Sequence, residues 1–368
     1  MSCSRPGTVD VAVVGGGIAG VTIASELTAT HSVALLEQED HLAHHATGRS
    51  AAAFLESYGS PEVCALTRAS RPVLEAADAP TPLLTARHLL WIAGPGRHHA
   101  LEGLLARQPG LRAVTAARTR TLCPALRADH VDAAAVEEDA ADIDVAAMHQ
   151  MYVRRARSLG CAVVTGARLV GAVRDRGRWR LQHAAGGLVT GLVVNAAGAW
   201  ADRVAALLGA RPCGLRPLRR TIAIGRTPRP LDTASPLVAD VDERFYFRPE
   251  GPHVLVSPAD ETPSDPCDAR PDESDVALAI ERVNEATTLG IRSVVASWAG
   301  LRTFAPDRNP VVGFDPDVPG LFWLAGQGGY GIQMAPALAR LAAARVRGQP
   351  CPVPGVDLAK LSPARFRP

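Results

Sequence analysis

Val9-Asp10-Val11-Ala12-Val13-Val14-Gly15-Gly16-Gly17-Ile18-Ala19-Gly20 is the stretch that decides the fold of this chain. An apolar strand runs into the spacing GxGxxG, and a helical pattern of apolar residues follows it. A second apolar strand begins at Ser32 and ends in the acidic residue Glu37. Strand, glycine turn, helix, second strand and terminal acid together form the fingerprint of a dinucleotide-binding βαβ unit.

Each part of this fingerprint has a physical reason. Gly15 permits a tight turn, Gly17 lets the backbone approach a pyrophosphate, and Gly20 lets the helix pack close to the strand. The N-terminus of the helix offers free N–H groups to the phosphates, and Glu37 is expected to accept a hydrogen bond from a ribose hydroxyl. The residues predicted to contact the dinucleotide in this unit are Gly15, Gly17, Ile18, Ala19, Gly20, Glu37 and Gln38.

Three further segments indicate a flavin dinucleotide rather than NAD. Thr47-Gly48-Arg49-Ser50-Ala51-Ala52 follows the second strand, and Val193 to Trp200 forms an apolar strand that ends in small residues. Gly326-Gln327-Gly328-Gly329-Tyr330-Gly331-Ile332 lies between the apolar strand 321–325 and a long helical pattern. NAD does not need a second glycine turn before a helix. A reduced flavin carries negative charge, which the amides of a helix N-terminus stabilise.

The chain resembles the D-amino acid oxidase class of FAD-dependent amine oxidoreductases, which includes glycine and sarcosine oxidases. The resemblance runs over almost the whole chain and is strongest to bacterial D-arginine dehydrogenase. It rests on ordered blocks, namely GGGIAG (15–20), HATGRSAA (45–52), Tyr58-Gly59, ALTRASR (65–71), ADID (141–144), NAAGAW (195–200), PLRR (217–220), Phe245-Tyr246, WAGLR (298–302) and QGGYGIQ (327–333).

The resemblance implies an α/β fold. A Rossmann-like FAD-binding domain of the glutathione-reductase type would be joined to an α+β substrate domain built on an antiparallel sheet. The FAD-binding domain is expected to be discontinuous, with residues 1–80, 142–210 and 305–368. Residues 81–141 and 211–304 would form the substrate domain. Helices are expected at 61–76, 98–107, 144–159 and 274–289, and strands at 87–92, 221–224 and 294–300.

The cofactor implied is noncovalent FAD. The sarcosine-type oxidases hold their flavin through a cysteine in the block that matches Ala299 to Arg302, and this chain has none there. Beyond the fingerprint, the positions that match family contacts to the cofactor are His45, Thr47, Arg49, Ser50, Ala51, Leu169, Ala196, Gly198, Trp200, Gly328, Gly329, Tyr330, Gly331 and Ile332.

The resemblance also implies the reaction. A hydride would leave the Cα of an amino acid for flavin N5, and the imino acid would hydrolyse to a keto acid and ammonia. Arg302 and Arg220 match the arginines that hold the substrate carboxylate, a role that suits the planar guanidinium. Tyr58 and Tyr246 match tyrosines that bind the substrate, and the Gly329 carbonyl matches an acceptor for its amine. No general-base side chain is required if the amine binds neutral.

Three departures from D-arginine dehydrogenase change the predicted substrate. Leu89 stands where the relative has an acid that pairs with the substrate guanidinium, Ala53 replaces a histidine, and Leu55 replaces a threonine. An unpaired buried cation costs several kcal/mol, so the pocket should favour neutral, apolar side chains. Glu56 is the one nearby acid that a cationic substrate could recruit if its side chain turned inward.

The electron acceptor is open between a quinone and oxygen. A lysine beside the flavin promotes the oxygen reaction of sarcosine-type oxidases, whereas the single lysine of this chain, Lys360, lies in the C-terminal tail. A dehydrogenase is therefore favoured, although D-amino acid oxidases use oxygen without such a lysine. Three alternatives stay open: a glycine- or sarcosine-type amine oxidase, an FAD-carrying subunit of a larger amine dehydrogenase, and a plain NAD(P)-dependent dehydrogenase.

Bulk composition fits a two-domain enzyme that acts on a small molecule. The 368 residues carry a net charge of +2 without a dense basic run, so nucleic acid is not an expected partner. The seven cysteines form no CxxC pair and indicate reduced thiols. No apolar run of about 18 residues is present to span a membrane. The glycines of the N-terminal apolar run belong to the fingerprint rather than to an export signal, so we expect a cytoplasmic protein.

A metal site is not expected. His41, His44 and His45 are close in sequence, but we see no carboxylate or cysteine in their company, and His45 falls at a cofactor-loop position of the family.

Overall fold

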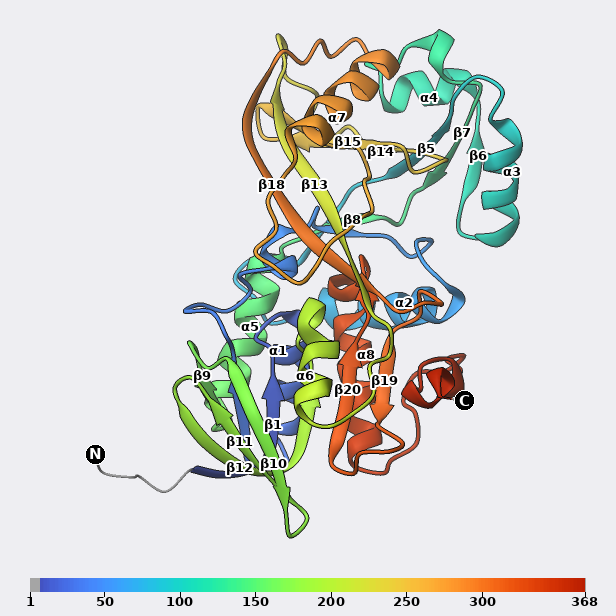
Figure 1. Cartoon of the computed structure of the whole chain (residues 1–368). Coiled ribbons are helices and arrows are strands. Elements are labelled where there is room, and N and C mark those ends of the chain that lie inside the picture. Colours follow the sequence, from blue (N-terminus) through green and yellow to red (C-terminus); the bar gives the residue numbers. More distant parts are fainter. Residues whose placement is uncertain (1–6, 368) are drawn as a thin grey trace.

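The computed structural model describes residues 7–367. Within this range the strands form three sheets, of eight, ten and three strands. Figure 1 shows the eight-stranded sheet in the lower part of the molecule and the ten-stranded sheet in the upper part, with two long strands, β13 and β18, running between them. The lower sheet contains β1 (Gly7–Val14), β2 (Val33–Leu36), β9 (Ala162–Val164), β10 (Leu169–Asp175), β11 (Arg178–His183), β12 (Gly186–Asn195), β19 (Val311–Phe314) and β20 (Leu321–Ala325).

The fingerprint strand β1 lies at the centre of the lower sheet. It pairs in parallel with β12 on one side and with β2 on the other, and β12 pairs in parallel with β20. Val11 to Val14 are buried, which explains why this strand is continuously apolar rather than alternating. Both predicted turns therefore follow parallel strands that end at the same edge of one sheet, where α/β proteins bind their ligands.

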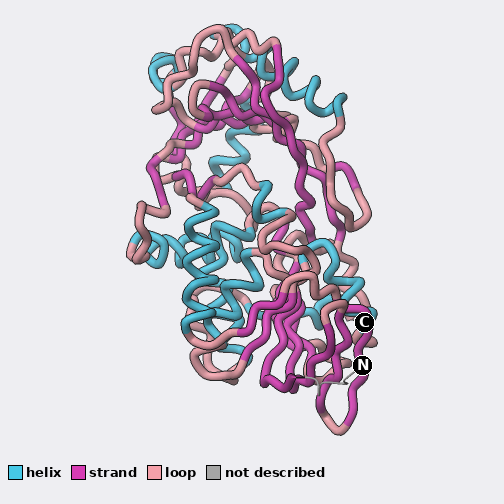
Figure 2. Tube along the Cα trace, turned by 90° about the vertical axis from the view of Figure 1, so that its left-hand side faces the viewer, coloured by secondary structure: helices cyan, strands magenta, loops and turns pink. Residues whose placement is uncertain are grey.

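Helices cover this sheet and carry the two glycine turns. Helix α1 (Ile18–Leu27) packs against both α5 (Val145–Ser158) and α8 (Gly331–Val346), and α2 (Pro61–Glu75) packs against α8. Helix α8 is alanine-rich and buried over most of its length, as expected for a helix enclosed by other elements. In Figure 2 the helices gather beside the lower sheet, and long strands extend from the upper sheet down towards it.

The upper sheet follows the order β21-β18-β13-β16-β15-β14-β5-β7-β6, with β17 paired to β13. Its strands are β5 (Leu89–Ala93), β6 (Arg112–Val114), β7 (Ala133–Glu137), β13 (Arg216–Arg226), β14 (Leu237–Asp240), β15 (Tyr246–Glu250), β16 (His253–Ser257), β17 (Thr262–Pro263), β18 (Ser293–Phe304) and β21 (Gln327–Gly328). The expected antiparallel sheet has one exception, because β14 and β5 run parallel.

Several predicted boundaries move by one to four residues. The strand expected at 87–92 begins at Leu89, and the strand expected to end at Gly300 continues to Phe304, so Arg302 lies inside β18 rather than at its end. The remaining elements are α3 (His98–Arg107), α4 (Ala116–Leu122), α6 (Ala201–Leu207), α7 (Glu273–Ala286), the small sheet of β3 (Ala53–Phe54), β4 (Leu84–Ala86) and β8 (Ala141–Ile143), and the 3-10 helices at Ala46–Arg49, Ala128–His130, Gly198–Trp200, Leu358–Lys360 and Pro363–Phe366.

Strand membership supports a division of the chain that we propose as two domains. Residues 1–80, 142–210 and 305–368 would form the first, and residues 81–141 and 211–304 the second. The short strand β21 comes from the first set of residues but pairs with β18 of the second. Over residues 7–367, no helix has both the length and the apolar character needed to cross a bilayer.

Candidate active site

A cavity of about 1140 Å³ extends from the end of the lower sheet to the face of the upper sheet. This volume is slightly larger than that of ordinary ligand pockets, which enclose about 300–1000 Å³. Nearly all the residues predicted for the cofactor and the substrate line it. The two exceptions are Gly20 and Tyr330.

The fingerprint turn requires its glycines. Gly15 has φ +112, and a Cβ there would lie 2.3 Å from the Ala196 carbonyl oxygen. A Cβ on Gly20 would lie 1.8 Å from the Gly15 carbonyl oxygen, so Gly20 serves the close approach of helix and strand and does not face the cavity. The Glu37 carboxylate accepts a hydrogen bond from Gly16 N at 2.6 Å. Glu37 therefore also holds the turn, in addition to its predicted contact with a ribose.

A buried histidine that the sequence reasoning missed supports the same turn. His149 on α5 lies with Nε2 3.0 Å from the Gly16 carbonyl oxygen, and burial lowers its pKa despite this contact. The ring is thus held neutral and donates its proton to the carbonyl. Its position within the helical pattern gave no signal, because the partner is 133 positions away in sequence.

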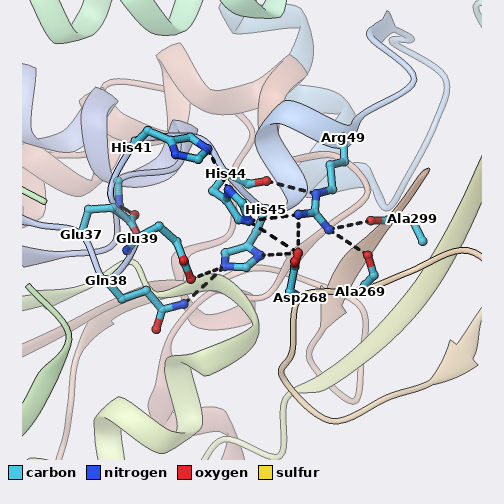
Figure 3. Close-up of polar contacts among 11 residues, drawn as sticks. Glu37, Gln38, Glu39, His41, His44, His45, Arg49, Asp268, Ala269 and Ala299 are labelled. Atoms are coloured by element: carbon cyan, nitrogen blue, oxygen red, sulfur yellow. Dashed lines mark hydrogen bonds and ion pairs between the residues drawn. The ribbon is translucent and has the colours of Figure 1, made fainter. Parts of the chain in front are cut away.

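The predicted cofactor loop is tied to the upper sheet by Arg49 (Figure 3). The five N–H donors of its guanidinium all have acceptors. Nε donates to the His44 carbonyl, Nη1 to the carbonyls of Ala269 and Ala299, and Nη2 to His44 Nε2 and the Asp268 carboxylate. Arg49 lines the cavity, but its donors are already used to join the loop to the segment at 268–269 and to β18.

The histidines of this loop do have carboxylate company, contrary to our reading of the sequence. His45 Nε2 lies 2.9 Å from Glu39, and His44 Nε2 lies 3.5 Å from Asp268. Glu39, His44 and His45 bring ligand atoms close enough together to hold a metal ion. The Arg49 guanidinium beside His44 and Asp268 opposes a cation there, as Figure 3 shows. The absence of a metal stays a prediction.

The second glycine turn lies against the predicted carboxylate clamp. Gly328 has φ +56, and a Cβ on Gly329 would lie 1.7 Å from Arg302 Nη2. Only glycine at position 329 lets the Arg302 guanidinium pack against this turn. Tyr330 precedes α8 and packs its ring edge-on against Tyr58, with ring centroids 5.0 Å apart, so it shapes the site from behind the cavity wall.

Arg302 and Arg220 point their free nitrogens at one place. Neighbouring strands carry them, since β18 pairs with β13 in the register that sets Gly300 opposite Arg220. Both side chains are mostly buried, and Arg302 Nη1 and Arg220 Nη2 have no hydrogen-bond partner among the described residues. Glu261 Oε1 lies 3.7 Å and 3.5 Å from these two atoms, and Arg308 binds the same carboxylate.

Glu261 is a site residue that the sequence reasoning missed. Burial raises the pKa of its carboxyl, but Arg308, Arg302 and Arg220 lower it by more, so the pKa is lowered and the group stays ionised. One carboxylate shared by three guanidinium groups leaves net positive charge. Positive charge of this kind favours an anion in the part of the cavity that Arg302 and Arg220 line.

The two predicted tyrosines flank this clamp. Arg302 Nη2 donates to the Tyr58 hydroxyl at 3.0 Å, and that hydroxyl donates to Glu243 at 3.3 Å. Tyr246 lies on β15 with the Arg220 guanidinium 6.0 Å from its ring centre. Tyr58, Tyr246 and Glu243 all line the cavity.

Part of the cavity lining is apolar. Ala53, Leu55 and Leu89 line the cavity together with Trp91, Leu237 and Ala239. Glu56 does not turn inward. Its carboxylate pairs with Arg71 at 2.5 Å, and it is not among the described residues that line the cavity.

The loop that carries Tyr58 is held by two buried side chains. Glu137 on β7 accepts from Glu56 N at 2.7 Å and from both Ser57 N and Oγ, while Gln333 on α8 bonds Leu55 N and O at 3.2 and 3.1 Å. Gln333 also donates to the Tyr58 carbonyl at 3.4 Å. Neither residue was predicted, because a side chain that satisfies a distant loop leaves no pattern in the sequence.

The residues present fit FAD. The fingerprint turn leaves room for a diphosphate, Glu37 lies at the end of β2, and the second turn presents the N-terminus of α8 to the same cavity. Bound FAD supplies a hydride acceptor. The protein contributes positive charge at Arg302 and Arg220, an apolar wall, and a rigid Tyr58.

In this chain the glycine turn of a βαβ unit and two arginines, Arg220 and Arg302, line one cavity. This combination is typical of a class of flavin-dependent oxidoreductases. The model of the family described as "FAD dependent oxidoreductase" (DAO) matches residues 10–345, so this chain belongs to that family.

Known proteins of the family resemble the chain at moderate identity. The bovine FAD-dependent oxidoreductase domain-containing protein 1 is 34% identical over 42% of this chain, and the matched part is 35% of the bovine protein. Glycerol-3-phosphate dehydrogenase 1 of Mycobacterium tuberculosis is 26% identical over 80% of this chain and 63% of its own length. The matches thus span from about a third to under two thirds of these relatives.

Solved structures share the fold over nearly the whole chain. Glycine oxidase from Geobacillus kaustophilus superposes with a TM-score of 0.83 at 23% identity, covering 98% of this chain and 99% of its own. L-proline dehydrogenase from P. horikoshii gives 0.85 at 20% identity, with 98% of each chain covered.

Proposed function

We propose that the protein oxidatively deaminates an amino acid with a neutral side chain, most favourably a D-amino acid, with FAD as the hydride acceptor. The observation that carries the proposal is the pair of mostly buried arginines, Arg302 and Arg220, that line the cavity beside the second glycine turn. Two such groups demand an anion, and a carboxylate is the anion that an amino acid brings.

The apolar residues that line the cavity favour a substrate with a neutral side chain. Leu89 and Leu55 replace polar positions of the arginine-oxidising relative, and Glu56 is already paired with Arg71. A cationic side chain directed at this wall would lose its water without gaining a countercharge, at several kcal/mol. Neutral substrates such as D-leucine, D-methionine, D-phenylalanine or D-proline meet no such cost.

In this proposal the chain orients the substrate and the cofactor performs the oxidation. Arg302 and Arg220 hold the carboxylate, Tyr58 and Tyr246 enclose the Cα, and the Gly329 carbonyl accepts from the amine. We favour a dehydrogenase that passes its electrons to a quinone, with oxygen as the alternative acceptor. A cytoplasmic location goes with this proposal.

The test is an anaerobic flavin-bleaching screen of the purified yellow protein over D-amino acids, L-amino acids, glycine, sarcosine and glycerol 3-phosphate. We expect neutral D-amino acids to reduce the flavin at least about a hundredfold faster than D-arginine or D-lysine, because an unpaired buried charge costs several kcal/mol. Fast bleaching by sarcosine or glycerol 3-phosphate alone would overturn the proposal.

Two variants at one position sharpen this test. Leu89→Glu restores a countercharge and should shift preference toward D-arginine, whereas Leu89→Gln has the same length without the charge and should not. A wild-type protein that already prefers D-arginine by a wide margin would contradict the apolar-wall argument.

A further inference from the structure

Glu261 lies beside both arginines of the clamp without lining the cavity. Its Oε1 is 3.5 Å from Arg220 Nη2 and 3.7 Å from Arg302 Nη1, and both of these nitrogens are enclosed by protein. Arg220 and Arg302 line the cavity, whereas Glu261 is not among the described residues that do. The carboxylate therefore acts on a ligand in the cavity through its charge rather than by contact.

Glu261 is held firmly in this place. Arg308, in the turn between β18 and β19, donates to both of its oxygens at 2.7 and 2.9 Å, and the same guanidinium lies 4.0 Å above the centre of the Phe304 ring. The residue before it, Asp260, accepts from Thr221 N at 2.7 Å and so ties the turn to β13. Directly after Glu261, β17 pairs with β13. Backbone and side chain are thus both fixed next to the clamp.

Two negative charges adjoin the clamp. Burial raises the pKa of the Glu261 carboxyl, but the three arginines around it lower the pKa by more, so the group is ionised. Glu243 is the second acid, and it lines the cavity. It accepts from the Tyr58 hydroxyl at 3.3 Å, and that hydroxyl accepts from Arg302 at 3.0 Å.

The charge at the clamp suits an anion with a single charge. Three arginines and two glutamates leave one positive charge, while Asp260 faces Arg219, which is not part of the clamp. A carboxylate balances one positive charge. A phosphate monoester carries about 1.5 to 2 negative charges at pH 7 and would leave negative charge unbalanced in a largely buried site, which is costly.

We propose that Glu261 is a specificity-determining residue that acts through Arg220 and Arg302, so that the clamp favours singly charged groups such as carboxylates and disfavours dianions such as phosphate esters. This proposal rests on the proposed function, in which the same clamp holds the substrate, and it names the class of anion that the clamp takes.

The experiment uses the FAD-bound protein and two anions of similar tetrahedral shape, methanesulfonate with one negative charge and sulfate with two. Each anion is titrated at constant ionic strength, and its dissociation constant is read from the change in the visible absorption of bound FAD. The wild type is compared with Glu261→Gln, which removes the charge and keeps the shape, and with Glu261→Asp, which keeps the charge.

The two anions should respond differently to loss of the charge. A fixed charge acts on a dianion with twice the energy that it has on a monoanion, so the change in the dissociation constant is squared. We expect Glu261→Gln to bind methanesulfonate about fivefold more tightly and sulfate about twenty-fivefold more tightly. In Glu261→Asp the ratio of the two constants should stay near that of the wild type.

A purely structural role of Glu261 gives the opposite result. Displaced arginines would bind both anions more weakly, or would change both constants by the same factor, and either outcome would overturn the proposal. It would also be overturned if neither anion changed the flavin spectrum in any of the three proteins.

Glu75→Gln is the matched control. Glu75 pairs with Arg71 at 3.3 Å on α2 and is not among the described residues that line the cavity, so both dissociation constants should stay close to those of the wild type. FAD content and thermal unfolding show whether each variant is folded.

Failure of the proposed function looks different, because the titrations need no turnover. If no amino acid reduces the flavin and the squared response is still seen, amino-acid oxidation is wrong and the preference for a single charge stands. If amino acids reduce the flavin and Glu261→Gln changes both constants equally, only the role of Glu261 is wrong.

Discussion

Arg302 and Arg220 are only partly neutralised by the side chains around them. Glu261 is shared by both and by Arg308, and its pKa is lowered by these three guanidinium groups, so one negative charge faces three positive ones. In a buried site this excess attracts an anion more strongly than it would in water, because the local dielectric constant is lower. In the function we propose, a substrate carboxylate supplies the negative charge that this arrangement lacks.

Replacement of Arg302 should remove the clamp and spare the cofactor. In Arg302→Met we expect kcat/KM for the best substrate to fall about a hundredfold or more, equivalent to about 3 kcal/mol of transition-state binding, with normal FAD content. Arg216→Met, on the exposed start of β13, is the matched control and should keep its rate. An unchanged kcat/KM in Arg302→Met would show that another group holds the carboxylate.

Sequence reasoning found the residues that face the cavity and missed those that hold them. Arg302 and Arg220 were found because their blocks resemble a known family. Glu137, His149 and Glu261 were missed because their partners lie far away in sequence or carry no motif. A buried carboxylate or imidazole is recognisable only when its distant acceptor or donor is known, and that requires the tertiary structure.

At the level of elements, the second glycine turn and β18 form one unit. Gly328 pairs with Thr303 across β21 and β18, which places the adjacent Gly329 against Arg302. The turn therefore presents the N-terminus of α8 on one side and supports the clamp on the other. The sequence predicted the turn, the strand 321–325 and the helix after Tyr330, because each has a local signature. It did not predict that the turn would support Arg302.

Gly329→Ala should separate cofactor binding from substrate binding. The added Cβ would lie within 2.2 Å of three atoms of the Arg302 guanidinium group, the mobile end of a long side chain, so the clamp would move and the fold would persist. We expect normal folding and retained FAD, with kcat/KM reduced about a hundredfold, since displacement of about 1 Å has effects of that size. Gly110→Ala, where an added Cβ meets nothing within 4 Å, is the control. A fully active Gly329→Ala would show that the contact is not needed.

The loop at 55–58 makes stability depend on pH through Glu137. Burial raises the pKa of this carboxyl, and hydrogen bonds from Ser57 and Glu56 offset the rise only in part. The folded protein therefore binds the proton more tightly than the unfolded chain, and this group lowers stability as pH rises above its ordinary value of 4.5.

Glu137→Gln keeps an acceptor for the two backbone N–H groups and removes the charge. Thermal unfolding from pH 5 to 8 should show that the variant loses less stability than the wild type as pH rises. A larger loss in the variant would mean that the ionised carboxylate stabilises the loop.

At the scale of the whole molecule, the cavity is shared by two sheets of different origin. The lower sheet was predictable because β1, α1 and β2 are consecutive and carry a motif. The strand order of the upper sheet was not predictable, because β5 and β14 pair in parallel although about two fifths of the chain separates them. A strand that pairs with a distant strand shows only alternating apolar residues in the sequence. This alternation does not indicate which strand lies next to it in the sheet.

We expect the residues that line the cavity to hold FAD without a covalent bond. No cysteine occurs from Ser293 to Phe304 in β18, the strand nearest the second turn. Acid precipitation of the yellow protein should leave all of the colour in the supernatant. Colour retained in the pellet would disprove noncovalent attachment. The FAD-free protein should unfold at a lower temperature than the FAD-bound one, because a ligand that binds only the folded state stabilises it.

The bonds between Leu55 and Gln333 also constrain how the protein is made in a cell. These residues are 278 positions apart, so a ribosome that adds about 5–20 residues per second needs roughly 15 to 55 s to reach Gln333 after Leu55. In the later part of that interval, after β12 is made, β1 and β12 exist without β20, and the nascent chain exposes apolar strand surface. FAD cannot find its complete site until Gln333 has been synthesised. The yield of FAD-bound protein would then depend on the concentration of free FAD at that time. It would also depend on chaperones that cover the exposed strands.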